Sequence, residues 1–512
     1  MLTLHRAERA VELAHALADI LTVPLADPFT PEVIAVPAKG IERWLTQRLS
    51  TVLGAEESDG VAANIGFPSP TRLVDEAIAA ASGIDADDDP WSTPRQLWTL
   101  LDVIDASLDE PWCAVLKAHL TGEHRITRRY ATAAHITDLW RAYGAERPQL
   151  FVDWAADRDT DGAGGLLAPD LGWQAQLWRR LRSHLATPSP AERLGAACEQ
   201  LRAEPASSGL PHRFSLFGPT RLTTEQLAVL DALSLHRDVH LWIAHPSPAV
   251  WAALSRRPAA PRRRDDTSAL AVHHPLMASL ARDTREMQQR LSPVLDHNLH
   301  HGTERPATTL LRHIQADLSA DRPPERAANA DGTVQVHACH GAPRQVEVLR
   351  EVLLHLFQQD PSLEPRDVLV MCPDVEAYAP LIRAAFGQGD TGGHPGHRLR
   401  VRLADRSLRR TNPLLDTVAG LLDLADGRVT ASQVLDLAAH GPVRRMFGFG
   451  DDDLEQLRTW VTSSGIRWGV KLIQRQAFGL PDVPQNTWTT GLDRILLGVA
   501  ADETDLAWLG QA

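Results

Sequence analysis

The sequence has 512 residues, of which 44% are hydrophobic and 23% are charged. This balance is typical of a globular protein of about two to four domains, and no apolar run approaches the roughly 18 residues that a membrane-spanning helix needs. The 52 basic and 65 acidic residues give a net charge of -13, which argues against a nonspecific nucleic-acid coat but leaves room for a basic channel. The N-terminal segment lacks the pattern of a signal peptide, so we expect a cytoplasmic protein with no membrane partner.

Of the 52 basic residues, only three are lysines, and the other 49 are arginines. We attribute the arginine excess to a GC-rich genome, although arginine is also preferred at phosphate contacts. A Walker A loop needs a lysine followed by Ser or Thr, and a PD-(D/E)xK nuclease needs an acidic residue two positions before a lysine. No lysine here has either neighbour, so the sequence predicts neither site. The lysines are Lys39, Lys117 and Lys471.

The four cysteines are far apart and form no CxxC pair, so we expect neither a disulfide framework nor a zinc finger. The nearest approach to a metal-binding motif is His337, Cys339 and His340. In a strand, His337 and Cys339 share one face while His340 begins the turn. Because no second pair of ligands lies nearby, we predict no metal site.

The first elements along the chain read as alternating helices and strands. Residues 5–21 have helical periodicity, and the apolar stretch 31–40 predicts a strand that leads into an amphipathic helix at 41–53. A second apolar stretch, 61–70, precedes the helical segment 71–81. These residues therefore predict the strand-turn-helix units of an α/β domain.

A long helical region and a second set of strands follow. Residues 85–205 have helical periodicity throughout, and two strands at 212–220 and 238–246 flank a helix at 223–236. The latter segments predict a βαβ unit in a parallel sheet. Tryptophans at helical spacing are most often core residues, with stacking on a nucleobase as the alternative. Those in the helical region are Trp98, Trp112, Trp140, Trp154, Trp173 and Trp178.

Proline- and arginine-rich sequence separates these elements from another βαβ pattern. The second pattern has strands at 334–341 and 367–373 around a helix at 343–359. We therefore predict an α/β fold with two doubly wound parallel-sheet domains. The predicted parts are residues 1–254 with a helical insertion at about 85–205, a linker with connecting helices at 255–332, and a second domain at 333–512.

Nine segments, in their order along the chain, resemble the RecC family, the gamma subunits of exodeoxyribonuclease V (RecBCD). No single segment identifies the family, but nine segments in the same order along the chain are specific for it. The similarity runs from residue 1 to about residue 501. Family members extend far beyond position 512, so the resemblance is to their N-terminal part and does not include their nuclease-like C-terminal domain. The segments are VIAVPAKGIERWLTQRL, ANIGFPSPTRLVDEA, FSLFGPTRLTTEQLAVLDAL, HPLMASLARDTREM, HACHGAPRQVEVLREVLLHLF, PRDVLVMCPDVEAYAPLIRAAF, LADRSLRRTNPLLD, SSGIRWGV and NTWTTGLDRILLG.

The resemblance implies the frame of a UvrD-type P-loop helicase that has lost its catalytic motifs. The segment before residue 31, where the phosphate loop would lie, contains no glycine. Gly218, Pro219 and Thr220 stand where active relatives carry a magnesium-binding Asp-Glu pair. The chain is therefore expected to be non-catalytic, with no catalytic residue, metal or cofactor of its own, while ATP and Mg²⁺ are used by partner subunits.

The same resemblance implies a subunit of an ATP-dependent helicase-nuclease that repairs double-strand breaks by homologous recombination. Its expected partners are the RecB and RecD subunits, double-stranded DNA ends and single-stranded DNA. Its expected role is to split the duplex, guide single strands and scan one of them for the Chi signal. Two alternatives remain: an assembly scaffold for RecB and RecD without a grip on DNA, and a helicase or nuclease in its own right, which the lysine pattern disfavours.

The resemblance also marks candidate residues of the DNA and Chi channel. Lys39 and Arg43 flank a strand-helix turn, where a helix N-terminus and cations can hold phosphate; a solvated first turn is the alternative. We expect Lys39 to neutralise phosphate, and Arg43 and Arg141 to pair with base edges. Better-studied relatives have uncharged polar residues at the first two positions and an acidic one at the third, which leaves the recognised sequence open. The candidates are Pro37, Lys39, Arg43, Ser69, Asp75, Asp138, Leu139, Arg141 and Arg147.

Two further basic clusters receive structural interpretations. Residues 127–130 combine two arginines with Tyr130 and are interpreted as a solvated helix face. Residues 262–264 are three arginines followed directly by two aspartates, as expected for a mobile linker.

Overall fold

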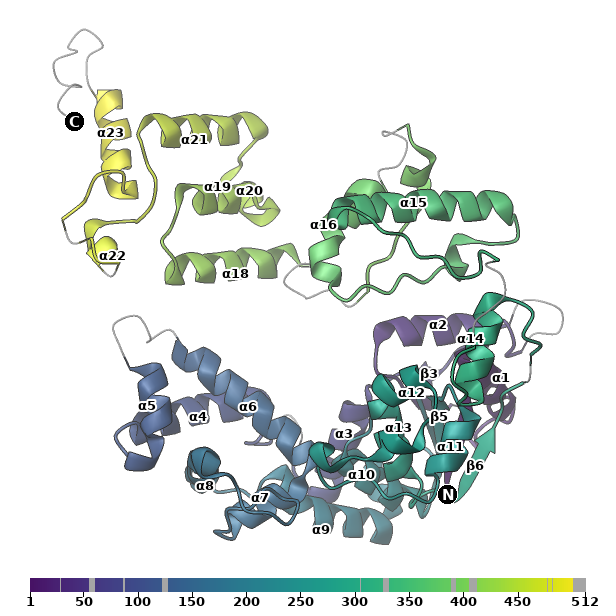
Figure 1. Cartoon of the computed structure of the whole chain (residues 1–512). Helices are drawn as coiled ribbons and strands as arrows, with labels where there is room; N and C mark the ends of the chain where they lie inside the picture. Colours follow the sequence, from purple (N-terminus) through teal and green to yellow (C-terminus); the bar gives the residue numbers. More distant parts are fainter. Residues whose placement is uncertain are drawn as a thin grey trace. The chain divides into compact units, whose positions relative to one another are not determined.

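The computed structural model describes the whole chain except residues 28, 55–59, 86–87, 122–127, 304, 326–330, 388–392, 405–411, 477, 481 and 501–512. The chain forms two compact units (Figure 1). Unit 1 comprises Met1–His119 and Arg129–Ala338, and unit 2 comprises Leu120–Arg128 and Cys339–Ala512. Each unit is described separately below.

Unit 1 is built on a six-stranded sheet in the order β3-β2-β4-β5-β1-β6, with every pair of neighbours parallel. The sheet confirms the predicted α/β class, and β4 and β5 confirm the predicted βαβ unit. Because parallel sheets are covered on both faces, their strands are apolar; Phe214 and Leu216 of β4 are fully buried. The strands are β1 (Leu2–Ala7), β2 (Glu32–Ala35), β3 (Ile65–Gly66), β4 (Arg213–Phe217), β5 (Asp238–Ala244) and β6 (His297–His300).

The start of the chain differs from the prediction, because the helix expected from residue 5 begins only at Ala10. Residues 2–7 form β1, in the interior of the sheet between β5 and β6. Leu2 and Leu4 pack on one face of the sheet, and His5 lies on the other. This period of two fits a strand better than a helix. Helix α1 (Ala10–Leu21) follows after a short turn.

Helices cover both faces of the sheet. Helices α1 and α2 (Lys39–Leu49) pack on the face that carries Ile34, Phe217 and Trp242. The opposite face carries Leu4, Leu216 and further apolar residues, and it is also covered by helices. The sheet is therefore doubly wound, as predicted. The helices on this second face are α3 (Pro70–Ser82), α9 (Pro190–Ala203), α10 (Thr224–Ser234) and α13 (Arg282–Leu291).

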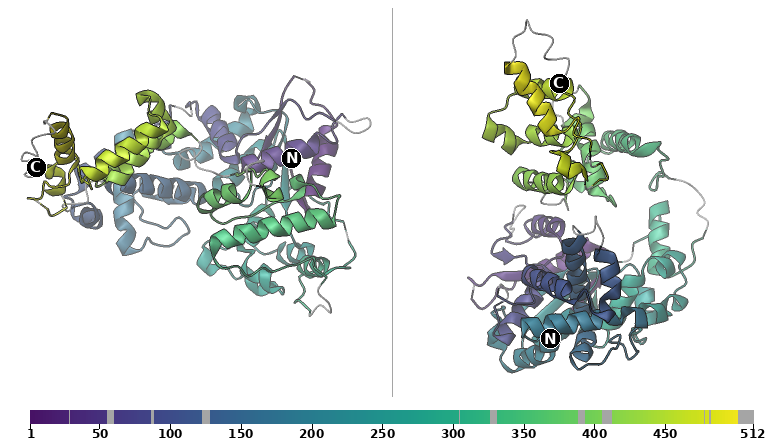
Figure 2. Two further views of the ribbon diagram at one scale, coloured as in Figure 1. Left: turned by 90° about the horizontal axis from the view of Figure 1, so that it is seen from above. Right: turned by 90° about the vertical axis from the view of Figure 1, so that its left-hand side faces the viewer.

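The region between α3 and α9 is helical, as predicted, and most of it forms a bundle beside the sheet (Figure 1 and Figure 2). Trp140, Trp154 and Trp178 are core residues of this bundle, as predicted. Trp98 does not follow the prediction, because it is 60% exposed and lies next to Tyr130 with ring centroids 5.6 Å apart. The helices of the bundle are α4 (Thr93–Ser107), α5 (Ala114–Leu120), α6 (Arg128–Glu146), α7 (Pro148–Ala155) and α8 (Gly172–Leu185).

The stretch expected to be a linker with connecting helices also supplies part of the sheet. Its strand β6 pairs with β1 through Thr3 opposite His297 and His5 opposite Leu299. Strand β6 has the sequence HNLH and is exposed, so it lacks the apolar signal of a buried strand. The helices here are α12 (Pro275–Ser279), α13 and α14 (Leu310–Ser319), and α11 (Pro248–Leu254) directly precedes the stretch.

Unit 2 is helical in the residues that the structure describes, so the prediction of a second parallel sheet is wrong for this part of the chain. Neither expected strand, 334–341 or 367–373, pairs in a sheet: Gly341 already begins α15, and Pro365–Asp367 is a 3-10 helix. Met371 of the second segment is highly exposed. The apolar core of this part of unit 2 is small and centres on Val346 and Phe386. A parallel sheet needs cover on both faces, which this core does not provide. The helices are α15 (Gly341–Gln359), α16 (Val375–Ala385), α18 (Pro413–Asp426), α19 (Ala431–Ala439), α20 (Gly441–Phe447), α21 (Asp451–Ser463), α22 (Leu472–Gln476) and α23 (Trp488–Ala500).

Within the described part of the chain, every helix is too short or too polar to cross a lipid bilayer.

A chain of hydrogen-bonded imidazoles joins three neighbouring strands of the sheet. His5 of β1 contacts His240 of β5 at 3.0 Å between ring nitrogens, and it contacts His301, which follows β6, at 2.9 Å. The His5 ring also stacks on Trp242 with a centroid distance of 3.8 Å. Burial and the two neighbouring histidines lower the pKa of His5 to about 3, and burial also lowers the pKa of His240 and His301. The chain of imidazoles therefore holds the three strands together while its histidines are neutral.

We expect unit 1 to lose stability as the pH falls from about 6.5 toward 4, because the unfolded chain binds protons in this range while folded His5 does not. Each such histidine contributes a slope of about 1.4 kcal/mol per pH unit. A His5→Gln variant should unfold at a lower temperature at pH 7 but show a shallower decline between pH 7 and pH 5. Thermal unfolding followed by circular dichroism measures both. The exposed His119→Gln control should keep the original slope, and an equal slope in the His5 variant would contradict the assignment.

Candidate functional site

The sheet order creates a switch point between β2 and β4. The chain leaves β2 toward β3 at one side of the sheet, whereas it leaves β4 toward β5 at the other side. The connecting helices therefore diverge at the carboxyl ends of these two neighbouring strands. In open parallel sheets, ligands bind in the crevice that such a divergence creates.

Helix α2 begins at this edge, directly after β2. The amide of Val36 donates to the carbonyl of Pro68 at 2.9 Å, which joins the turns that follow β2 and β3. Ala38 is the N-cap residue of α2 and supplies no side-chain hydrogen bond. The first amides of α2 therefore remain without a side-chain cap, in a position that favours an anion.

The cations of α2 differ in their pairing. Lys39, the first residue of the helix, has an 81% exposed side chain and forms an ion pair with Glu42 at 2.9 Å. Arg43, one turn later, is exposed and has no ion pair or hydrogen bond from its guanidinium within the described structure. An exposed pair of the Lys39 type is worth little, about 0 to 1 kcal/mol. Both side chains are therefore available to a ligand, together with the exposed Pro37 before them.

Helix α3 begins at the same edge, after β3. Ser69 is its N-cap, and its hydroxyl accepts the amide of Arg72 at 3.2 Å. This cap, followed by Pro70 at the first helical position, explains why the helix starts here. The Ser69 hydroxyl thus has a structural task, but the residue remains exposed at the edge.

The turn after β4 packs against the start of α2. Gly218 has a φ of 70°, and a Cβ at this position would lie 3.5 Å from Ile41 of α2. The backbone turn therefore needs glycine in a left-handed conformation and approaches α2 closely. Neither Gly218 nor the adjacent Pro219 and Thr220 supplies a carboxylate for Mg²⁺.

The C-terminal end of α6 is fixed to the start of α10. The Thr224 hydroxyl donates to the carbonyl of Glu146 at 2.8 Å. The Glu146 carboxylate pairs with Arg221 at 2.7 Å and with Arg290 of α13 at 2.8 Å. These contacts attach the helical bundle to the sheet edge and hold α6 beside α10.

Arg147, one of the candidates, has a scaffold role in the free protein. Its guanidinium donates to the carbonyl oxygens of Asp161 at 3.2 Å and Pro261 at 3.4 Å. Arg262 in turn forms an ion pair with the Asp161 carboxylate. Arg147 and Arg262 therefore cross-link two loops, and the interpretation of residues 262–264 as a mobile linker does not hold for Arg262.

Asp75 of α3, Arg141 of α6 and Glu225 of α10 form a charged cluster. Burial and, to a smaller extent, the nearby Asp75 carboxylate raise the pKa of Glu225 to about 7, against the opposing effect of Arg141. Desolvation by the surrounding protein also raises the pKa of Asp75, although its side chain is exposed, and Arg141 again opposes the shift. None of the three makes a hydrogen bond or ion pair within the described structure. Asp75 and Arg141 are among the candidate residues predicted from the sequence, whereas Glu225 is not. The sequence feature that could have indicated Glu225 is its place in the first turn of a helix that follows a strand of the sheet.

The remaining candidates lie on α6. Asp138 is exposed and precedes Arg141 by one turn, so the two share a face of the helix. Leu139 is half-buried. The structure thus brings Pro37, Lys39, Arg43 and Ser69 to one sheet edge, and it brings Asp75 and Arg141 together. Arg147 is not free to bind a ligand, because its guanidinium donates hydrogen bonds to two loop carbonyl oxygens.

The turn after β1 carries acidic residues where a phosphate loop would carry glycine. Glu8 pairs with His300 at 2.9 Å, and Glu12 in the first turn of α1 accepts the Thr303 hydroxyl at 2.9 Å. These carboxylates repel phosphate, and they attach the chain around β6 to α1. In the part of the chain that the structure describes, no group of His, Cys, Asp and Glu is arranged to hold a metal ion. Thr127 of the basic-aromatic cluster lies outside the described residues.

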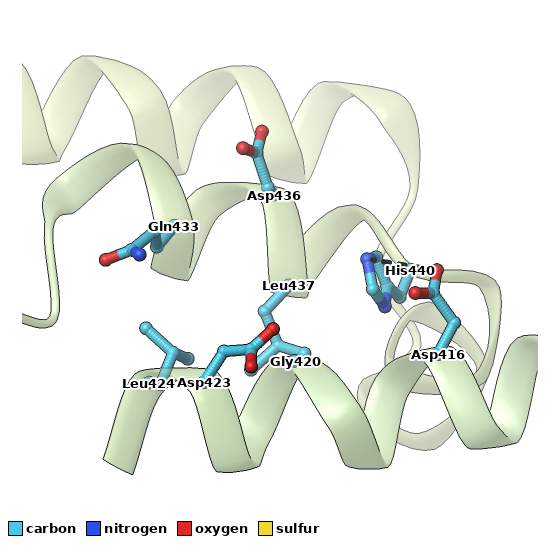
Figure 3. Close-up of a pocket in the computed structure, with 8 residues that line it drawn as sticks. All are labelled: Asp416, Gly420, Asp423, Leu424, Gln433, Asp436, Leu437 and His440. Atoms are coloured by element: carbon cyan, nitrogen blue, oxygen red, sulfur yellow. Dashed lines mark ion pairs between the residues drawn. The ribbon is translucent and has the colours of Figure 1, made fainter. Parts of the chain in front are cut away.

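Unit 2 has a pocket between α18 and α19 of about 240 Å³ (Figure 3). His440 forms an ion pair with Asp416 at 3.9 Å on its wall. Asp423 and Asp436 also line it, so its acidic character disfavours a phosphate backbone. We do not include this pocket in the candidate site.

Comparison with known proteins identifies relatives along the whole chain. The sequence matches the family description "RecC, N-terminal domain" over residues 2–321 and "RecBCD enzyme subunit RecC fourth domain" over residues 411–512. It is 48% identical to the RecBCD enzyme subunit RecC of Mycobacterium tuberculosis over 529 residues, covering 100% of this chain and 47% of the relative. The corresponding protein of Mycolicibacterium smegmatis is 48% identical, with 99% and 46% covered, and that of Escherichia coli is 28% identical, with 94% and 46% covered. The chain spans about half the length of these relatives.

Substitutions of Arg147 and Arg43 should distinguish a residue that stabilises the fold from a residue that is free to contact a ligand. We expect Arg147→Ala to lower the free energy of unfolding by about 1 to 3 kcal/mol, because it removes two charge-assisted hydrogen bonds that join loops. Arg43→Ala should change it by less than about 0.5 kcal/mol, because it removes no contact. Urea unfolding followed by tryptophan fluorescence compares the two variants. Equal stability of both would refute the scaffold role of Arg147.

Proposed function

Because the chain belongs to the RecC family, we propose that it is a non-catalytic subunit of a RecBCD-type helicase-nuclease that guides single-stranded DNA. The observation that carries this proposal is the switch point at the carboxyl edge of β2 and β4. There the uncapped start of α2, Lys39 and the unpaired Arg43 present positive potential at the edge where bound ligands lie in open parallel sheets. A single strand supplies the phosphates that such an edge attracts and the bases that the neighbouring Arg141 recognises.

The proposed partners follow from the names of the relatives, which are RecBCD enzyme subunits. We propose that RecB-like and RecD-like subunits assemble with this chain and supply the ATP- and Mg²⁺-dependent steps in recombinational repair of double-strand breaks. Among the residues of this chain, the acidic turn at Glu8 and the lysine pattern support a non-catalytic role. In the complex, the chain would receive the DNA end, lead one strand along the sheet edge and test it for a Chi-like sequence.

A second candidate function is an assembly scaffold that does not grip DNA. It is favoured by the net charge of -13 and by the use of Arg147 and Glu146 in internal contacts. The two functions differ in one measurable property, because only a DNA conduit loses affinity for single strands steeply with salt.

The first test is a titration of the full chain with single-stranded DNA at several salt concentrations. A conduit should show a log-log slope of roughly -0.7 per phosphate contact. Lys39→Ala should weaken binding to every sequence alike and make the slope shallower by about 0.7. Lys117→Ala is the matched control, because Lys117 is also an exposed, ion-paired lysine but lies in α5. A binding curve that is independent of salt, or no binding at all, would favour the scaffold.

The second test concerns ATP. We expect no ATP hydrolysis above background by the purified chain, with or without DNA, because it lacks the phosphate-loop lysine and the paired carboxylates that stabilise phosphoryl transfer. A phosphate-release assay measures this, and photo-crosslinking of an azido-ATP probe should also fail. DNA-stimulated hydrolysis that co-purifies with the chain through every column would contradict the non-catalytic assignment.

A further inference from the structure

The most exposed tryptophan of the described chain lies in the helical bundle of unit 1. Trp98 of α4 is 60% exposed, whereas Trp140, Trp154 and Trp178 of the same bundle are buried. Tyr130 of α6 is 53% exposed, and its ring lies beside Trp98 with a centroid distance of 5.6 Å and an angle of 50° between the ring planes. Because the planes are tilted rather than stacked, the two rings do not cover each other's faces. Aromatic surface therefore remains open to a ligand at this pair.

The two rings are held together by contacts between their helices. Arg129, directly before Tyr130 on α6, forms an ion pair with Asp105 of α4 at 3.2 Å. The aromatic contact between Trp98 and Tyr130 joins the same two helices. The rings are therefore positioned by the fold before a ligand binds, which lowers the entropy cost of ordering them in a complex.

The surroundings of the pair favour a small planar ligand over a protein surface. Within α4 and α6, Trp98 and Tyr130 are the exposed large hydrophobic residues. Their neighbours on α4 one turn away, Arg95 and Asp102, are exposed and charged. A stable protein interface buries about 800 Å² per partner around a more apolar centre, which two isolated rings in a charged surface do not supply. A nucleobase needs only the face of a ring, because every base has a π face of its own.

Helix α6 connects the aromatic pair to the candidate site at the sheet edge. Its exposed residues include Tyr130 toward one end and Asp138 and Arg141 toward the other. Tyr130 and Arg141 are about 16 Å apart along the helix axis and within about 20° of each other around it, so they lie on the same side of α6. The hydrogen bond between Thr224 and the Glu146 carbonyl fixes the far end of α6 beside α10. A single strand at the sheet edge can therefore reach the pair along one side of α6 (Figure 1).

We propose that Trp98 and Tyr130 form a stacking site for a base of the bound single strand, with the ring of Trp98 against the plane of the base. The proposal rests on the proposed function, and it extends the path of the strand from the sheet edge to the helical bundle. Stacking uses ring faces and no charge, so the site accepts every base. Its contribution to affinity depends little on salt, in contrast with that of Lys39.

The test compares an oligo-dT of about 15 nucleotides with an abasic strand of the same length, which keeps the phosphates but lacks the bases. We would titrate the full chain with each labelled strand and follow the fluorescence anisotropy. Trp98→Leu should weaken binding of oligo-dT by about tenfold, which corresponds to about 1.4 kcal/mol, and leave binding of the abasic strand unchanged. The slope of log affinity against log salt should stay the same, because no phosphate contact is lost.

Two further variants of the pair and one control accompany this test. Tyr130→Leu should show the same pattern with a smaller loss, whereas Trp98→Phe keeps an aromatic ring and should retain most of the affinity for oligo-dT. Trp460→Leu is the matched control, because Trp460 is a 43% exposed tryptophan of α21 in unit 2. It should bind both strands as the unchanged chain does.

An unchanged affinity of Trp98→Leu for oligo-dT would overturn the proposal. An equal loss of affinity for both strands would also overturn it, because this result would indicate a disturbed bundle rather than a lost base contact. If the unchanged chain binds neither strand, the proposed function itself fails together with the stacking site. This outcome is distinct from binding of oligo-dT that Trp98→Leu leaves unaltered, which removes the stacking site alone.

Discussion

The parallel pairing of all six strands is the constraint on which the candidate site depends. Parallel strands place their carboxyl ends at one edge, so the turns after β2, β3 and β4 meet although they are separated by up to about 180 residues of sequence. The divergence of the chain between β2 and β4 then opens that edge. The long helical insertion leaves from β3 and returns to β4 without disturbing this geometry, because Glu146 and Thr224 fasten its α6 helix to the start of α10.

The arginines that stabilise the fold differ from those of the candidate site in whether their side chains are paired. Arginines that join segments have partners: Arg147 binds two loop carbonyls, and Arg290 binds Glu146. At the sheet edge, Arg43 and Arg141 have none within the described structure. A protein gains little from exposed ion pairs, so stability alone does not require charges at the edge. Their unpaired state is consistent with a ligand that supplies the partners, and because the net charge is -13, any attraction for DNA has to come from a local basic region.

The sequence predicts those parts of the fold whose signals are local. Apolar runs and helical periodicity revealed β2, β4, β5 and the helices between them, because the burial pattern of one element shows within a few residues. Strand β6 was missed, because its HNLH sequence is stabilised by pairing with β1 and by the His5–His301 contact rather than by apolar burial. The resemblance supplied Asp75 and Arg141 as candidates, but not Glu225, whose pKa is raised by burial in the folded protein and by the nearby Asp75. The bonds of Arg147 to distant loops are equally invisible in the sequence. The expected second sheet fails because a local strand pattern does not supply cover for both of its faces.

The most direct test of the central claim is hydrogen-deuterium exchange of the full chain with and without single-stranded DNA. If the carboxyl edge binds the strand, the amides in the first turns of α2, α3 and α10 and in the last turns of α6 should exchange more slowly in the complex, while the amides of β6 and of unit 2 around α18 and α19 should be unchanged. Protection that is absent from residues 37–43 and 69–75 and appears elsewhere would contradict the account, because the strand would then bind at a surface other than the switch point of the sheet.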